Sequence, residues 1–296
     1  MKYSAEALKV LAGRELGHYE TKAQFWKLAP NPEQLNQLIC EEAKTIEIKM
    51  HALLQNLEQQ GITGMICAFD PEFPAYSESA PNGERPSLLF YRGDISLLKK
   101  GRRVAVIGET GPAADIENRE KTIVNELLQK DVVIVSGLAK GCDRIAHACT
   151  LEAEGKTIAI LPSTIGKIIP AENRKLAEEI VSKGGLLLTE YAREPASAYE
   201  QTSRYIERDH LQALFSKAVV MIASYRKGEG DSGSRHAMEA AWKYGGETFV
   251  MYDEKTDRGE ISLGLNQYYY ESKRIPKFDL DAVLNACPGE PISLFD

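Results

Sequence analysis

Short apolar runs alternate with amphipathic segments from Arg103 onward, and this alternation dominates most of the chain. The apolar runs are rich in β-branched residues, which is typical of buried strands, and the segments between them have helical spacing. The expected strands are Val104–Ile107, Val132–Val135, Thr157–Leu161, Leu186–Thr189, Val219–Ala223 and Thr248–Tyr252. The expected helices are Ile116–Lys130, Asp143–Glu154, Asn173–Ser182, Tyr205–Phe215 and Ser232–Trp242. Single helices between such apolar strands predict an α/β fold with a mostly parallel sheet covered on both faces.

The first part of the chain has a different pattern. Apolar residues near helical spacing predict short helices at Ala5–Ala12, Glu33–Glu42 and Ile46–Gln60, and no strong strand pattern precedes residue 65. We therefore expect a small helical N-terminal domain at 1–64, a core at 65–258 and a C-terminal extension at 259–296. In that extension, Tyr268–Tyr270 fits either a strand or a packing patch.

Composition and charge limit the classes of function. The chain has 296 residues with 43% hydrophobic and 27% charged residues, as is usual for a globular protein with a sizeable core. Its five cysteines form no CxxC pair, and no apolar run has the length of a membrane span or signal peptide. We therefore expect a reduced, cytoplasmic protein with no metal or cofactor and no membrane association. The net charge of −7 counts against nucleic-acid binding by bulk charge, but it allows a local basic groove.

Glycine-containing turns follow two of the expected strands. Gly108 ends the first strand, while Ser136, Gly137, Lys140 and Gly141 lie between the second strand and its helix. A turn of this kind leaves backbone N–H groups unpaired beside the positive end of the helix dipole, so it favours anions such as phosphates. Asp143 stands where a helix cap or a first-turn acid belongs, and we assign it that structural role.

A third candidate turn contains Gly233, Ser234 and Arg235, between a strand and the helix that follows it. Its polar residues fit either a second anion site or ordinary helix caps. Because ligands of parallel sheets bind at the carboxyl ends of the strands, the three turns are expected to converge. Further cations that could line the same edge are Lys167, Arg174, Arg204, Arg208, Arg226 and Lys227.

These segments resemble the DprA/Smf family of DNA-processing proteins. The matching stretches include Asp70–Pro74, Leu89–Asp94, Ser136–Asp143, Pro170–Leu176 and Leu186–Tyr191, within a span of roughly residues 65 to 255. The resemblance implies an extended Rossmann-like fold and a binding protein rather than an enzyme. It also implies non-specific binding of single-stranded DNA, a homodimer, and help to RecA in DNA recombination during natural transformation.

By the same resemblance, Ser136, Gly137 and Gly141 would hold a DNA phosphate, and Arg208 would match the first arginine of the family's arginine–asparagine–arginine element. The chain departs from the family pattern at several positions. Glu109 and Thr110 replace the usual serine and arginine after the first strand, and Asp209 and His210 replace the asparagine and second arginine of the later element. Too few residues follow the core for the C-terminal winged-helix domain that many members carry.

Two other functions would use the same pocket. The chain is loosely similar to LOG-type nucleoside-monophosphate phosphoribohydrolases, in which a glycine-rich turn precedes a helical glutamate. Glu239 would then act as acid or base at a ribose, while the turn at 136–141 binds the phosphate. The second alternative is a non-catalytic sensor of a small nucleotide, which the acidic Glu109 and the negative net charge favour.

Overall fold

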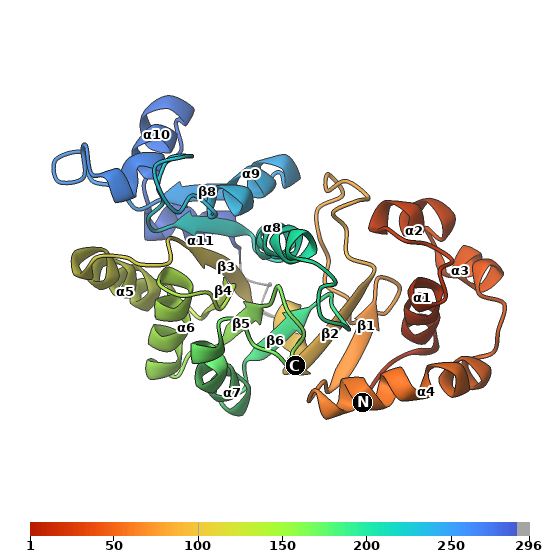
Figure 1. Cartoon of the computed structure of the whole chain (residues 1–296). Helices are drawn as coiled ribbons and strands as arrows, with labels where there is room; N and C mark the ends of the chain where they lie inside the picture. Colours follow the sequence, from red (N-terminus) through yellow and green to blue (C-terminus); the bar gives the residue numbers. More distant parts are fainter. Residues whose placement is uncertain (100, 289–296) are drawn as a thin grey trace, which may run out of the picture.

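An eight-stranded sheet forms the centre of the computed structural model, which describes residues 1–99 and 101–288 (Figure 1). The strands are β1 (Gly64–Cys67), β2 (Leu88–Gly93), β3 (Arg102–Ile107), β4 (Val132–Ser136), β5 (Thr157–Ile160), β6 (Leu186–Thr189), β7 (Ala218–Met221) and β8 (Glu247–Val250). Their order across the sheet is β1-β2-β6-β5-β4-β3-β7-β8. All neighbouring pairs from β6 to β8 are parallel, whereas β2 is antiparallel to both β1 and β6. The predicted α/β class with a mostly parallel sheet is confirmed.

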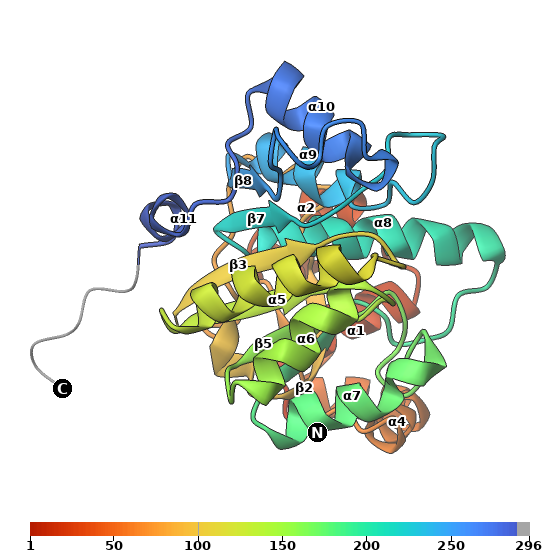
Figure 2. The same cartoon turned by 90° about the vertical axis from the view of Figure 1, so that its left-hand side faces the viewer.

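Helices cover both faces of this sheet (Figures 1 and 2). They are α1 (Ala5–Glu15), α2 (Lys22–Leu28), α3 (Pro32–Leu38), α4 (Ala43–Gln59), α5 (Ala114–Leu128), α6 (Cys142–Glu152), α7 (Arg174–Ser182), α8 (Ala198–Leu214), α9 (Arg235–Tyr244), α10 (Gly264–Lys273) and α11 (Leu280–Ala286). Side chains alternate between the two faces along each strand. Val104 and Val106 of β3 pack with α5, α6 and α11, whereas Ala105 and Ile107 pack with α8 and α9.

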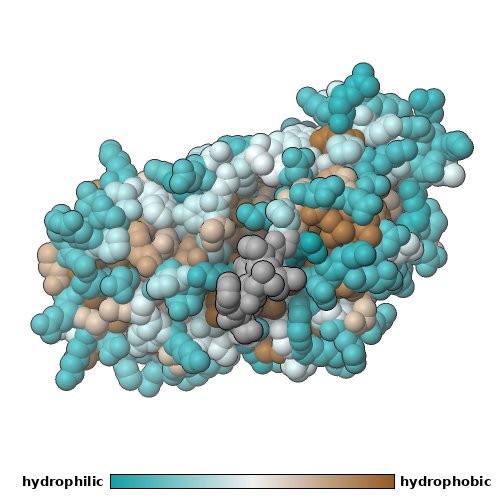
Figure 3. Space-filling model, turned by 180° about the vertical axis from the view of Figure 1, so that it is seen from behind, coloured by the Kyte–Doolittle hydropathy of each residue, from teal (hydrophilic) through white to brown (hydrophobic). Residues whose placement is uncertain are grey.

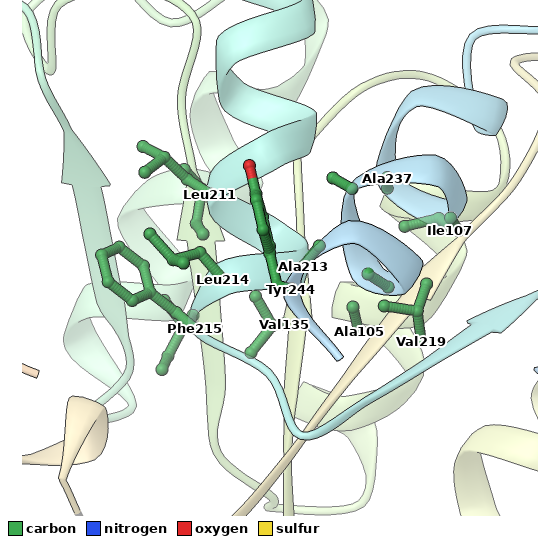
Figure 4. Packing of buried hydrophobic residues seen from close by; sticks show 14 of the residues in the cluster. Ala105, Ile107, Val135, Leu211, Ala213, Leu214, Phe215, Val219, Ala237 and Tyr244 are labelled. Atoms are coloured by element: carbon green, nitrogen blue, oxygen red, sulfur yellow. The ribbon is translucent and has the colours of Figure 1, made fainter. Parts of the chain in front are cut away.

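The cluster beneath α8 and α9 is shown in Figure 4. Leu211 and Leu214 come from α8, Phe215 follows its last residue, and Tyr244 comes from α9, which crosses the same face of the sheet. Seen from behind the view of Figure 1, the molecule has a mostly hydrophilic surface, with hydrophobic residues gathered in a few patches (Figure 3). The apolar runs of the sequence therefore lie mainly inside, where their burial stabilises the fold.

The N-terminal helices share a core with one half of the sheet. Leu8 of α1 and Ile46 of α4 belong to the same buried cluster as Phe90 of β2 and Leu187 of β6. The expected helical segment before the sheet is present, and β1 begins at Gly64. Because this core is continuous across residue 64, the division of the chain into three domains stays a prediction.

Several elements differ from the sequence-based expectation. The helix α2 was not predicted; its local signal is a capping box in which Thr21 and Gln24 exchange side-chain-to-backbone hydrogen bonds. The helix α8 begins at Ala198, seven residues before the predicted start at Tyr205, and Ser197 caps it. The sequence pattern missed these first turns because they are polar and exposed. Tyr269 lies in α10 and packs its ring against Trp242 at 4.9 Å, so Tyr268–Tyr270 is a packing patch and not a strand.

Candidate nucleic-acid interface

The turns after β3, β4 and β7 meet at the carboxyl edge of the sheet. These three strands are parallel neighbours in the order β4-β3-β7, so their carboxyl ends share one edge. Hydrogen bonds join these turns directly, among them one from the Glu109 N–H to the Ala223 carbonyl at 2.9 Å. The Cys142 N–H donates to the Glu109 carbonyl at 3.0 Å, and the Thr110 N–H donates to Asp231 Oδ2 at 3.0 Å. The structure therefore places Gly108, Gly141 and Gly233 on adjoining turns.

The turn after β4 has a backbone shape that depends on glycine. Gly141 has φ +65°, and a Cβ at this position would lie 2.3 Å from the Glu109 carbonyl oxygen. Leu138 also has a positive φ, of 57°, and Asn173 holds it by donating its Nδ2 to the carbonyls of Leu138 and Ala139 at 2.9 and 3.0 Å. Asn173 is thus a bracing residue for the turn, a role that sequence reasoning did not assign to it.

Asp143 occupies the first turn of α6, and Gly141 takes the cap position. Asp143 Oδ2 accepts a hydrogen bond from the Ala139 N–H at 3.2 Å. The aspartate therefore ties the preceding turn to the helix, as a first-turn acid rather than as the cap.

Two other residues assigned to phosphate binding have different environments. Ser136 is fully buried, and its Oγ donates to the Val106 carbonyl at 2.7 Å, so its hydroxyl braces β4 against β3. Lys140 has an exposed side chain whose Nζ lies 2.9 Å from Glu172 Oε2. Of these two side chains, Lys140 alone faces solvent and can approach a polymer.

Arg208 lies under the turn and is neutralised by carboxylates. Its Nη1 is 3.1 Å from Asp143 Oδ2, and its Nε is 2.9 Å from Asp209 Oδ1. A Cβ on Gly137 would fall 1.2 Å from Arg208 Nη1, so the guanidinium packs directly on this glycine. Gly137 is therefore required for the close approach of Arg208, and only 7% of Arg208 is exposed to solvent.

Three buried carboxyl groups at this edge hold protons unusually well. Burial raises the pKa of Asp209 to about 7, with Arg208 opposing the shift. Burial also raises the pKa of Glu120, on α5, to about 9 and raises the pKa of Glu109. Transfer of a carboxylate out of water favours its neutral form. At neutral pH Asp209 and Glu120 therefore carry less negative charge than two carboxylates in water would.

The turn after β7 contains a carboxylate that receives two backbone hydrogen bonds. The N–H of Thr110 donates to one oxygen of Asp231 at 3.0 Å, and the N–H of Gly233 donates to the other at 3.2 Å. Ser234 is buried at the start of α9, and Arg235 is partly exposed with its Nη1 3.2 Å from Ser232 Oγ. This arrangement brings donors from two strand-end turns onto one anionic group.

A basic cleft lies beside these turns, over the loops that follow β5 and β6. It has a volume of about 570 Å³, and its cations are Arg92, Lys167, Arg174 and Arg193. Two glutamates also line it: Glu178 pairs with Arg92 at 2.6 Å, and Glu194 pairs with Lys167 at 3.0 Å. The predicted cations therefore gather only in part, since Arg204 lines a different cavity.

Glu239 is exposed on α9, one helical turn after Arg235.

Within residues 1–99 and 101–288, no three His, Cys, Asp or Glu side chains are grouped as metal ligands. No helix in these described ranges combines the length and apolar character needed to cross a bilayer.

The fold defines a Rossmann-like α/β protein, a class in which ligands bind at the carboxyl ends of the parallel strands. Residues 64–271 match the family model described as DNA recombination-mediator protein A, so the chain belongs to this family. The resemblance seen in the sequence is confirmed.

Relatives of known type cover most of the chain. DNA processing protein DprA of Bacillus subtilis is 28% identical over 242 residues, which is 77% of each chain. Protein Smf of Synechocystis is 28% identical over 304 residues, covering 95% of this chain and 73% of the relative. The structure of DprA from Streptococcus pneumoniae shares the fold with a TM-score of 0.64 at 22% identity, over 96% and 93% of the two chains.

DNA processing protein A from Helicobacter pylori, a structure described for its single-stranded DNA binding mode, has a TM-score of 0.60. It is 28% identical, over 72% of this chain and 91% of the other.

Proposed function

We propose that the chain is a DNA-processing protein that binds single-stranded DNA at the carboxyl edge of its sheet. The observation that carries the proposal is the pair of backbone N–H groups, from Thr110 and Gly233, that converge on one carboxylate. Donors arranged in this way also suit a phosphate oxygen. Phosphate contacts carry no sequence information, so the expected binding is sequence-independent.

The basic cleft favours a polymer over a single nucleotide. Lys167 and Arg193 stand on the loops after β5 and β6, and Arg174 begins α7. These residues lie beyond the turns after β4 and β3, so successive phosphates could contact both regions. Lys140 is exposed between them. The binding of DNA by the Helicobacter pylori relative adds support, since that protein shares the fold of this one. Because the net charge of the chain is −7, the attraction of DNA has to come from the local basic cleft and not from the charge of the whole protein.

The proposal is tested with a fluorescent oligothymidylate in anisotropy titrations at 50 and 200 mM salt. If four phosphates are contacted, affinity should fall about 50-fold across this range, because each contact releases counterions. The double variant Lys167→Ala/Arg174→Ala should weaken binding and flatten the salt dependence. Lys130→Ala, an exposed lysine that precedes β4 at the opposite edge of the sheet, is the matched control. Absence of binding at 50 mM salt would refute the proposal.

The two small-ligand alternatives, a nucleotide sensor and a phosphoribohydrolase, can be tested on the same protein preparation. A nucleotide sensor should be stabilised against heat by a mononucleotide more than by the oligonucleotide, because a ligand stabilises the state it binds. A phosphoribohydrolase should release free base from a nucleoside monophosphate and lose this activity in Glu239→Gln. We propose neither outcome and expect a binding protein rather than an enzyme.

Assembly and partners are further parts of the proposal, and they rest on the family alone. We expect a homodimer, detected by sedimentation, and an interaction with a RecA-type recombinase, detected as faster loading of the recombinase on coated single strands. A monomer at micromolar concentration would contradict the first expectation, and unchanged loading would contradict the second.

A further inference from the structure

The loop between β7 and α9 positions Asp231 against the turn after β3. The Tyr225 N–H donates to the Asp231 carbonyl at 3.1 Å, so the loop folds back on itself. A Cβ on Gly230 would lie 2.5 Å from the Tyr225 ring, which requires glycine at this position. The loop is thus shaped by its own contacts, and it delivers the Asp231 carboxylate to the Thr110 N–H from 121 residues away in sequence.

We infer that Asp231 is a built-in competitor for phosphate, whose carboxylate must leave the Thr110 and Gly233 N–H groups before a ligand phosphate can occupy them. This inference rests on the proposed function and assigns a residue that sets its selectivity. The two carboxylate oxygens are 3.0 and 3.2 Å from the two nitrogens, as expected for hydrogen bonds to an anion. Thr110 and Gly233 are both exposed, so a ligand can reach the same donors from solvent.

Charged neighbours favour the exchange of the Asp231 carboxylate for a ligand phosphate. Glu109 lies beside Asp231: burial and the charge of Asp231 raise the pKa of Glu109, whereas the hydrogen bond to Tyr225 lowers it. Release of Asp231 toward solvent separates these two acids. Arg235, at the start of α9 and partly exposed, remains near the vacated donors to meet the incoming phosphate.

Competition of this kind discriminates between ligands. A tethered group acts at an effective concentration on the order of millimolar. A lone phosphate or mononucleotide gains only the contacts that Asp231 gives up, so it displaces the carboxylate poorly. A single strand that also reaches Lys140, Lys167 and Arg174 has additional contacts to offset the exchange. Asp231 therefore selects polymers over small phosphates at this edge.

The inference is tested with Asp231→Asn, which removes the charge but keeps an oxygen acceptor in the loop. The matched control is Glu229→Gln, an equal charge change at an exposed position of the same loop. Affinity for the oligothymidylate should rise on the order of ten-fold in Asp231→Asn, because the binding-competent state becomes more populated. Inorganic pyrophosphate should stabilise Asp231→Asn against heat but leave wild type nearly unchanged. Glu229→Gln should bind within two-fold of wild type.

Equal gains in the two variants, or weaker binding by Asp231→Asn, would overturn the inference. A ligand-free measurement separates its failure from that of the proposed function. Amide exchange at Thr110 should be several-fold faster in Asp231→Ala than in wild type, and unchanged exchange would also overturn the inference. If exchange accelerates and pyrophosphate binds Asp231→Asn while no variant binds the oligonucleotide, the competitor role stands and the proposed DNA ligand fails.

Discussion

Replacement of Asp209 by asparagine should make the stability of the protein less dependent on pH. Asp209 is 9% exposed and shares Arg208 with Asp143, so Arg208 faces two carboxylates. Burial raises the pKa of Asp209 to about 7, whereas an unfolded chain has a value of about 3.9. The folded state therefore holds this proton more tightly than the unfolded state, and stability falls as pH rises from about 4 to about 7.

The magnitude follows from the shift in pKa. Each unit corresponds to about 1.4 kcal/mol, so the full loss is about 4 kcal/mol, and the part between pH 5.5 and pH 8 is about 2 kcal/mol. Asp209→Asn does not titrate. Its free energy of unfolding should therefore exceed that of wild type by about 2 kcal/mol more at pH 8 than at pH 5.5, so the variant gains relative stability as pH rises.

Urea unfolding at the two pH values measures this difference, and comparison across pH cancels any constant cost of losing the bond between Asp209 and Gln212. The matched control is Asp115→Asn, an exposed carboxylate on α5, which should differ from wild type by the same amount at both pH values. A relative stability of Asp209→Asn that is constant within about 0.5 kcal/mol would refute the reasoning, since that shift would correspond to less than half a pKa unit.

Three further substitutions test the architecture of the edge. Gly141→Ala should cost roughly 2–4 kcal/mol in urea unfolding because it combines a positive φ with a contact to the Glu109 carbonyl; a cost below about 1 kcal/mol would contradict this. Asn173→Ala should cost about 2 kcal/mol by leaving two carbonyls without their donor, and faster amide exchange at 137–141 should accompany it; unchanged exchange would count against a bracing role. Glu120→Gln should gain about 2 kcal/mol of stability relative to wild type between pH 5.5 and pH 7, because burial keeps Glu120 protonated in the folded state while the unfolded chain ionises; a relative stability that stays constant over this range would contradict the raised pKa of Glu120.

The strands and most helices could be predicted from the sequence because they depend on local pattern. Continuous β-branched runs such as Val132–Val135 can be buried only in a sheet covered on both faces, and the structure has them there. The helix α2 was missed because its seven residues include only one buried side chain, Phe25, so no periodic pattern exists to detect. A search for capping boxes would have found its start at Thr21.

The site was less predictable because its chemistry depends on contacts between distant residues. Glycine positions identified the turns, since φ +65° at Gly141 is a property of the local chain. The pairing of Arg208 with Asp143 joins residues 65 apart, and no local pattern reveals that this cation is already neutralised. The contact of Asp231 with Thr110 is also non-local, and its sequence signal is only an aspartate two residues before Gly233.

Amide hydrogen exchange with and without a saturating oligothymidylate tests the central claim most directly. If DNA phosphates bind at the carboxyl edge, peptides that contain 108–112, 136–141 and 230–235 should become protected, together with 164–168 in the basic cleft. Protection should be absent at the opposite edge, for example at 75–77 and 213–217. Bound DNA that protects the opposite edge, or that leaves all three turns unprotected, would contradict the account.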